Sequence, residues 1–87
     1  MSLDSILAEA DALVDGARQA DYGHPRDDWT RTAAMWSAIL GCEVTAERAL
    51  LCMVAVKISR EVNKPNRDNR VDMAGYAKCL DMVTDGE

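Results

Sequence analysis

Of the charged side chains between Met53 and Cys79, a largely apolar stretch, five of both signs crowd the two sides of one short turn. Carboxylates supply the oxygen ligands that divalent cations prefer, and lysine and arginine side chains bind phosphate groups. This combination is typical of a site for a phosphorylated ligand, with or without a metal ion. The five residues are Lys57, Arg60, Glu61, Asp68 and Asp72.

Two predicted helices carry these charges as a hairpin. The third helix of the chain is predicted over residues 45–62, with Thr45 as its N-cap, and the fourth over residues 67–83. The sequence NKPN separates them, because the residue before a proline is pushed out of the helical region. The third helix is apolar nearly all round in its first half, which predicts that it is the central, buried helix.

The hairpin also predicts which charges face each other. Residues equally distant from a turn centred between residues 64 and 65 lie side by side, so Lys57 faces Asp72. By the same rule Glu61 faces Asp68. The two rungs lie about 6 Å apart, because a helix rises about 1.5 Å per residue. Asp72 falls in the middle of the apolar arc of its helix, so its side chain is predicted to point inward.

A buried carboxylate needs a partner, and two interpretations of Asp72 remain open. In the first, Lys57 and Asp72 form a structural ion pair that fixes how the hairpin docks and adds little net stability. In the second, the turn end of the bundle is a polar pocket. There Glu61, Asp68 and Asp72 hold a divalent cation, while basic side chains bind phosphates. The basic candidates are Lys57, Arg60, Arg26 and Arg31.

The loop YGHP is the second candidate for a site, and it joins the helices predicted over residues 3–20 and 26–40. Tyr22 offers an aromatic face, Gly23 permits a tight turn or a close ligand, and His24 is a titratable donor. In an up-and-down bundle this loop lies at the same end as the charged hairpin, which predicts one shared site. The alternative is a plain interhelical turn.

Elements of this kind predict an all-α fold: one domain, residues 1–87, built as an antiparallel bundle of about four helices that a second subunit could complete. Ser2 or Asp4 is the predicted N-cap of the first helix, and Gly41 the stop of the second. Pro25 and the acids after it suit a helix start. The apolar stripe of the second helix is Trp29, Ala33, Trp36 and Leu40. Both tryptophans are predicted in the core or a subunit interface, with base stacking an alternative for Trp29.

Composition narrows the class of protein. The chain has 87 residues, 48% of them hydrophobic, and a net charge of −5 without a basic stripe. We therefore expect no nucleic-acid partner, although a small phosphate ligand needs only two or three cations. So small a domain buries little surface alone, which favours a homo-oligomer.

The cysteines, the apolar runs and the N-terminal sequence indicate the cellular compartment in which the protein is expected. The three cysteines lack metal-ligand spacing and suit the core of a protein in a reducing compartment. The apolar run from Ala49 to Val56 is too short to cross a membrane. The N-terminal sequence has acids where a signal peptide has basic residues. We therefore expect a cytoplasmic protein without a membrane partner.

Two stretches together resemble a known family. The sequences YGHPRDDWTRTAAMW and KISREVNKPNRDNRVDMAGYAKC, within residues 21–80, resemble small phage and prophage proteins with a YGHP loop and a K-x-x-R…D-x-x-x-D-x-x-G-Y-A hairpin. That family is remotely similar to the MazG-like all-α nucleotide pyrophosphohydrolases. This resemblance implies a homo-oligomer in the host cytoplasm, Mg²⁺ as cofactor and hydrolysis of nucleoside triphosphates.

The carry-over of the metal motifs is incomplete. The family's E-x-x-E motif falls on Lys57 and Arg60, with Glu61 adjacent, and its E-x-x-D motif falls on Asn69 and Asp72. Only Asp72 keeps the expected residue type. The hypothesis that follows assigns catalysis to Lys57, Asp72 and His24, metal binding to Glu61, Asp68 and Asp72, and ligand binding to Tyr22, Gly23, Arg26, Arg31, Lys57, Arg60 and Tyr76. The alternative hypothesis is a non-catalytic phage protein that binds a host protein or sequesters a nucleotide.

Overall fold

A computed structural model describes residues 5–84, and every regular element in that range is a helix. The all-α bundle expected from the sequence is therefore confirmed. The helices are α1 (Ile6–Asp15), α2 (Ala17–Tyr22), α3 (Pro25–Leu40), α4 (Ala46–Asn63) and α5 (Arg67–Thr84). Within the same range, no helix is long and apolar enough to cross a membrane.

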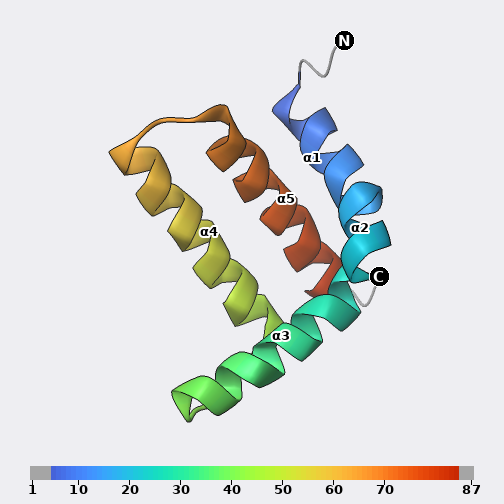
Figure 1. The fold of residues 1–87 in the computed structure, drawn as a ribbon, viewed down its shortest axis with the longest axis vertical. Helices are drawn as coiled ribbons and strands as arrows, with labels where there is room; N and C mark the ends of the chain where they lie inside the picture. Colours follow the sequence, from blue (N-terminus) through green and yellow to red (C-terminus); the bar gives the residue numbers. More distant parts are fainter. Residues whose placement is uncertain (1–4, 85–87) are drawn as a thin grey trace.

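The centre of the fold is α5. It lies between α1 and α4, while α3 crosses one end of this layer and contacts both α4 and α5 (Figure 1). The core joins Val14 of α1, Leu50 of α4 and Cys79 of α5. α1 packs against α5 at Gly75, where a Cβ would lie 3.6 Å from the Val14 side chain, an ordinary van der Waals contact. The helices α1, α5 and α4 therefore form one layer, and the core of the fold is small.

The prediction that helix 45–62 is the buried centre of the bundle is wrong. Only Ala49 and Leu50 of α4 are fully buried, and Val62 is 80% exposed. The physical reason is that α4 lies at the edge of the layer and packs only against α3 and α5. Leu40, placed in the apolar stripe of the second helix, is likewise exposed near the end of α3.

Helix ends follow the capping signals. The Thr45 side chain accepts a hydrogen bond from the Arg48 backbone and caps α4, as predicted. Gly41 ends α3 at a φ of 73°, in the left-handed region that glycine adopts without a Cβ clash, also as predicted. Ser5 caps α1, and the predicted caps Ser2 and Asp4 lie outside the described residues.

Gly16 breaks the predicted first helix. A single helix over residues 3–20 was expected, but the chain leaves α1 at Gly16 and starts α2 in a new direction. A Cβ at this position would lie 2.8 Å from the Ala12 carbonyl oxygen, so only glycine fits without a shift. The break gives α2 an orientation that a continuous helix could not have.

The YGHP loop and the α4–α5 turn lie at opposite ends of the layer, not at the same end (Figure 1). The expectation assumed that the second long helix returns alongside the first. Instead α3 crosses the end of the layer, so α4 starts near that end and runs back toward the start of α1. The loop and the hairpin charges can therefore meet only along the sides of the helices.

Candidate functional site

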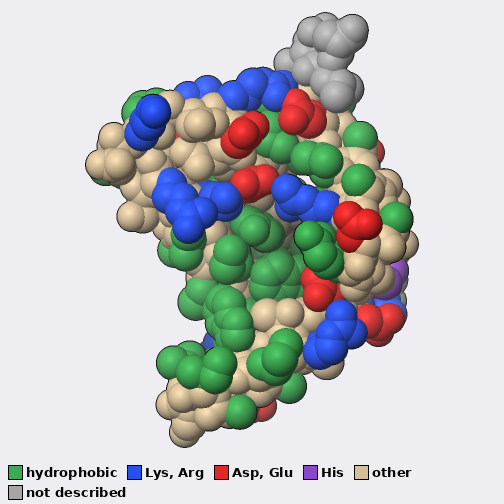
Figure 2. Space-filling view, in the orientation of Figure 1, with side chains coloured by type: hydrophobic (Ala, Val, Ile, Leu, Met, Phe, Trp, Pro, Cys, Tyr) green, Lys and Arg blue, Asp and Glu red, His purple; other side chains and the backbone are tan. Residues whose placement is uncertain are grey.

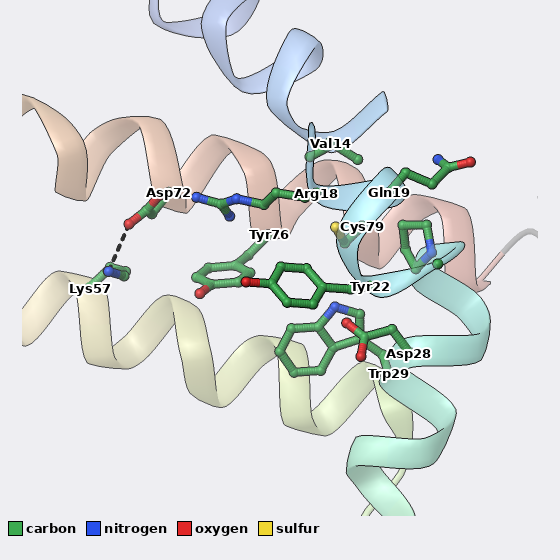
Figure 3. Close-up of a pocket in the computed structure, with 12 residues that line it drawn as sticks. Val14, Arg18, Gln19, Tyr22, Asp28, Trp29, Lys57, Asp72, Tyr76 and Cys79 are labelled. Carbon is green, nitrogen blue, oxygen red and sulfur yellow. Dashed lines mark hydrogen bonds and ion pairs between the residues drawn. The ribbon is translucent and has the colours of Figure 1, made fainter. Parts of the chain in front are cut away.

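A pocket of about 380 Å³ opens along the side of α5, between α1–α2 and α4 (Figure 3). This volume lies within the range of roughly 300–1,000 Å³ that small-molecule sites occupy. Lys57, Arg18 and Asp72 gather at one end of the pocket, and the aromatic rings lie toward the other end, where Asp28 also lies (Figure 3). The lining residues are Val14, Arg18, Gln19, Tyr22, Gly23, Pro25, Asp28, Trp29, Lys57, Asp72, Tyr76 and Cys79.

At the charged end, one carboxylate joins two cations from different helices. Lys57 Nζ lies 2.7 Å from Asp72 Oδ2, and Arg18 Nη2 lies 3.1 Å from Asp72 Oδ1. The Lys57 and Asp72 side chains are 13% and 17% exposed, whereas that of Arg18 is 40% exposed. The facing of Lys57 and Asp72 that the hairpin predicts is confirmed, and the cluster carries a net charge of +1.

The electrostatics of Asp72 follow from these partners. Burial acts to raise the pKa of Asp72, but hydrogen bonds and charge from Lys57 and then Arg18 outweigh it. The pKa of Asp72 is therefore lowered below its ordinary value, and the carboxylate is ionised at neutral pH. Because one anion balances two cations, a second anion could be accommodated beside Lys57 and Arg18.

At the aromatic end, rings from three helices surround the pocket. The rings of Trp29 on α3 and Tyr76 on α5 meet edge to face, with centroids 5.9 Å apart. Tyr22, the last residue of α2, is mostly exposed and lines the same pocket. Gly23 follows with a φ of 85°, which a residue with a side chain rarely adopts. A flat apolar group entering the pocket would meet ring surfaces there.

Five of the predicted site residues therefore line one pocket. They are Tyr22, Gly23, Lys57, Asp72 and Tyr76. These residues come from both stretches that the sequence singles out, but the pocket runs along the helices and not at one end of the bundle, and its role as a binding site stays a prediction. Trp29, for which base stacking was the alternative role, also lines it.

Other predicted site residues lie elsewhere. His24 caps α3, where its Nδ1 accepts a hydrogen bond from the Arg26 backbone at 3.0 Å. Arg26 lines a different hollow, between α3 and the start of α4. Its Nε and Nη2 atoms are buried there without a hydrogen-bond partner. Arg31 and Arg60 are exposed and line no part of the pocket.

The structure does not bring the predicted metal ligands together. Glu61 accepts hydrogen bonds from the Asn66 backbone, Arg70 Nε and the Asn69 amide. These contacts lower the pKa of Glu61, and the bond from Asn66 has the largest effect. Asp68 is exposed in the first turn of α5. Among residues 5–84, no group of three histidine, cysteine, aspartate or glutamate side chains could hold a metal ion.

The Mg²⁺ that the MazG-like resemblance implies therefore does not fit these residues. Mg²⁺ needs near-octahedral oxygen ligands, and both oxygens of Asp72 already contact cations. Glu61, which was predicted to face Asp68, instead ties the α4–α5 turn to Asn69 and Arg70.

Sequence reasoning missed Arg18 and Asp28 as pocket residues. Arg18 lies on α2, two residues after the break at Gly16, and contacts Asp72 from there; a glycine inside a predicted helix was the available signal. The sequence predicts that Asp28 interacts with the positive end of a helix dipole, and Asp28 does lie in the first turn of α3. Asp28 directly precedes Trp29, for which base stacking is the alternative role, and this neighbour was the signal that Asp28 could line the pocket.

Comparison with protein families agrees with the phage resemblance. Residues 5–84 match the family described as Domain of unknown function (DUF6378). Because the match covers nearly all of the chain, this protein belongs to that family.

Two phage proteins are close relatives. The chain is 37% identical over 81 residues to the Gene 55 protein of Mycobacterium phage D29, and 38% identical over 81 residues to that of Mycobacterium phage L5. These alignments cover 92% and 91% of this chain but 54% and 52% of the relatives, so the chain spans about half of their length. No solved structure matches the chain significantly.

Proposed function

We propose that this phage-type protein binds a nucleotide in the pocket beside α5 and does not hydrolyse it. The observation that carries the proposal is the division of the pocket. Two cations that share a single carboxylate stand at one end, and aromatic rings stand at the other. A nucleotide has the same division, with anionic phosphate at one end and a flat base at the other.

The phosphate would bind Lys57 and Arg18. Arg18 is the more exposed of the two, and a guanidinium presents several donors in one plane, which suits phosphate oxygens. Lys57 is held in place by Asp72, so little side-chain entropy remains to be lost when a ligand binds. Asp72 is then a positioning residue for both cations.

The base would stack on the rings at the other end. Base–aromatic stacking contributes about 1–3 kcal/mol per base. Tyr22 is exposed at the pocket mouth, and Trp29 and Tyr76 already fix each other by their edge-to-face contact. The base would therefore meet one exposed ring at the mouth and two rings inside that pack against each other.

Binding without hydrolysis follows from the carboxylates. Phosphoanhydride cleavage in the MazG-like proteins is expected to need metal ions held by several acids, and the described residues gather no such set. His24, the predicted catalytic histidine, uses its Nδ1 to cap α3. Sequestration or delivery of an intact nucleotide is the function that remains.

Isothermal titration calorimetry tests this proposal. The four ribonucleoside triphosphates and their deoxy forms are titrated into the wild-type protein and the variant Arg18→Met/Lys57→Met/Asp72→Leu. That variant replaces the whole ion cluster by apolar side chains of similar length, a change that often preserves stability. We expect binding to the wild type, and an affinity at least about tenfold lower in the variant, because charge-assisted hydrogen bonds are lost.

The matched control is Lys78→Met. Lys78 is also a lysine bound to carboxylates, those of Asp11 and Asp15, but it lies outside the pocket. We expect this variant to bind like the wild type. Absence of binding to the wild type, or equal binding in the triple variant, would overturn the proposal. Release of monophosphate and pyrophosphate from recovered nucleotide, measured by chromatography, would overturn the claim that the protein is not a hydrolase.

A further inference from the structure

Asp28 is a second carboxylate in the pocket, and the ion cluster does not use it. It lies on α3 beside Trp29, and Figure 3 shows Asp28, Trp29 and Tyr22 at the end of the pocket away from Lys57. Its only partner among the contacts of the described residues is Arg31, whose Nη2 is 3.4 Å from Asp28 Oδ1. The Arg31 side chain is 60% exposed, so this pair is weak.

Asp28 and the Lys57–Asp72 pair lie at opposite ends of the pocket. In Figure 3, Asp28 lies beside Trp29, and Lys57 and Asp72 lie at the far end, beyond Tyr76. A ligand that spans the pocket would therefore place one part beside Asp28 and another beside Lys57.

A carboxylate at the base end of the pocket has a definite chemical preference. It offers two acceptor oxygens and no donor. Guanine presents two adjacent donors, the ring N1–H and the exocyclic amino group, which match the two oxygens as a guanidinium does. Adenine and cytosine present an amino group next to an acceptor nitrogen, and uracil presents one N–H between two carbonyl oxygens. Those carbonyls or ring nitrogens would face the negative charge.

We propose that Asp28 selects guanine nucleotides by accepting hydrogen bonds from N1–H and the 2-amino group of the base. This inference rests on the nucleotide-binding function proposed above, and it assigns the base edge to Asp28 and the phosphate to Lys57 and Arg18. The weak contact with Arg31 leaves the carboxylate available, and Trp29 and Tyr22 supply the rings against which the base lies.

The experiment compares GTP, ATP, CTP and UTP by titration calorimetry with the wild type, Asp28→Asn and Asp27→Asn. Asp27 is the matched control, because it shares the first turn of α3 but is exposed and outside the pocket. Both substitutions remove one acid from the helix start, so any effect of the helix dipole is common to them. We expect the wild type and Asp27→Asn to bind GTP at least about tenfold more tightly than ATP, since a charge-assisted hydrogen bond contributes about 1.5–3 kcal/mol. Asp28→Asn is expected to lose that preference.

The possible results separate the two proposals. Equal affinity of the wild type for all four nucleotides would overturn the role of Asp28 and leave nucleotide binding standing. Retention of the GTP preference in Asp28→Asn would also overturn it. No binding of any nucleotide to the wild type would overturn both proposals. The wild-type preference needs no variant, so the inference stays testable even if Asp28→Asn folds poorly, which circular dichroism would reveal.

Discussion

The two faces of α4 differ in an unusual way. The inward face, which packs against α5, buries Leu50 fully, but it also holds Lys57, a charged side chain that is only 13% exposed. The outward face places Leu51, Ile58 and Val62 in solvent. A lysine is thus mostly buried while three aliphatic side chains are exposed along the same helix. In Figure 2, hydrophobic side chains gather over α4 and the adjoining part of α3.

A buried lysine costs free energy unless it is paired. Apolar side chains of similar size would fill the same space without that cost, so the pair of Lys57 and Asp72 on the inward face indicates a role other than packing. The outward residues Leu51, Ala55, Ile58 and Val62 are spaced by four, three and four positions, the spacing of helices that pair with other helices. The homo-oligomer expected from the sequence stays a prediction, and this stripe is where its interface is expected.

The largest effect on stability is expected for Asp72→Ala. This change leaves Lys57 mostly buried beside no acid and removes the partner of Arg18. Removing one member of a buried ion pair typically costs about 3–5 kcal/mol, and the partial exposure of this cluster reduces the expected loss to about 2 kcal/mol. Urea unfolding monitored by circular dichroism measures it. Asp81→Ala, an exposed acid on the same helix, is the control, and equal stability of the two variants would contradict a structural role for the cluster.

The next effect is on the acid stability of the protein. The folded pKa values of Asp72 and Glu61 are lowered from 3.8 and 4.5. Their contribution to stability is therefore fully present above those unfolded values and is lost as the pH falls through the lower folded values. We expect the urea midpoint to fall steeply below about pH 4.5 in the wild type and less steeply in Asp72→Ala. Parallel curves for the two proteins would contradict this assignment.

A smaller loss is expected for Arg18→Ala. The Arg18 side chain is 40% exposed, so water replaces much of its contact with Asp72, and Lys57 still pairs with that carboxylate. Exposed ion pairs contribute about 0.2–1 kcal/mol, and we expect a loss of less than 1 kcal/mol in urea unfolding. Nucleotide affinity should nevertheless fall, because the phosphate loses a donor. A variant with wild-type affinity would remove Arg18 from the proposed site.

The smallest effect on monomer stability is expected for Ile58→Glu, although it should change the state of association. Ile58 is half exposed in the middle of the outward stripe, and surface substitutions usually alter stability by no more than about 0.5 kcal/mol. Light scattering after size-exclusion chromatography should show an oligomer for the wild type and a monomer for the variant, because two buried glutamates would repel and lose water. A wild-type monomer at high concentration would show that the stripe does not pair with a second copy.

How far the sequence predicts this molecule depends on the range of the contacts. The pairing of Lys57 with Asp72 could be predicted because a short turn fixes the register of an antiparallel hairpin, so that counting from residues 64 and 65 suffices. Thr45 and Gly41 could be predicted because caps act over one helical turn.

The parts that could not be predicted depend on contacts across the whole fold. The position of α3 depends on how Trp29 packs against the core of Val14, Leu50 and Cys79, and no local pattern encodes that contact. Arg18 contacts Asp72 from α2, a separate helix that the sequence pattern does not distinguish from the first one. The expected acid cluster of Glu61 and Asp68 failed because Asn69 and Arg70 lie closer to Glu61 and satisfy it.

The fluorescence of Trp29 provides the most direct test of nucleotide binding in the pocket. Trp29 lines the pocket and Trp36, about two helical turns further along α3, does not. In Trp36→Phe, Trp29 is the single tryptophan, and we predict that GTP quenches its emission saturably, because the base lies against the indole. In Trp29→Phe, which retains only Trp36, the emission should not change. No saturable quenching in Trp36→Phe, or the same response in both variants, would contradict the account.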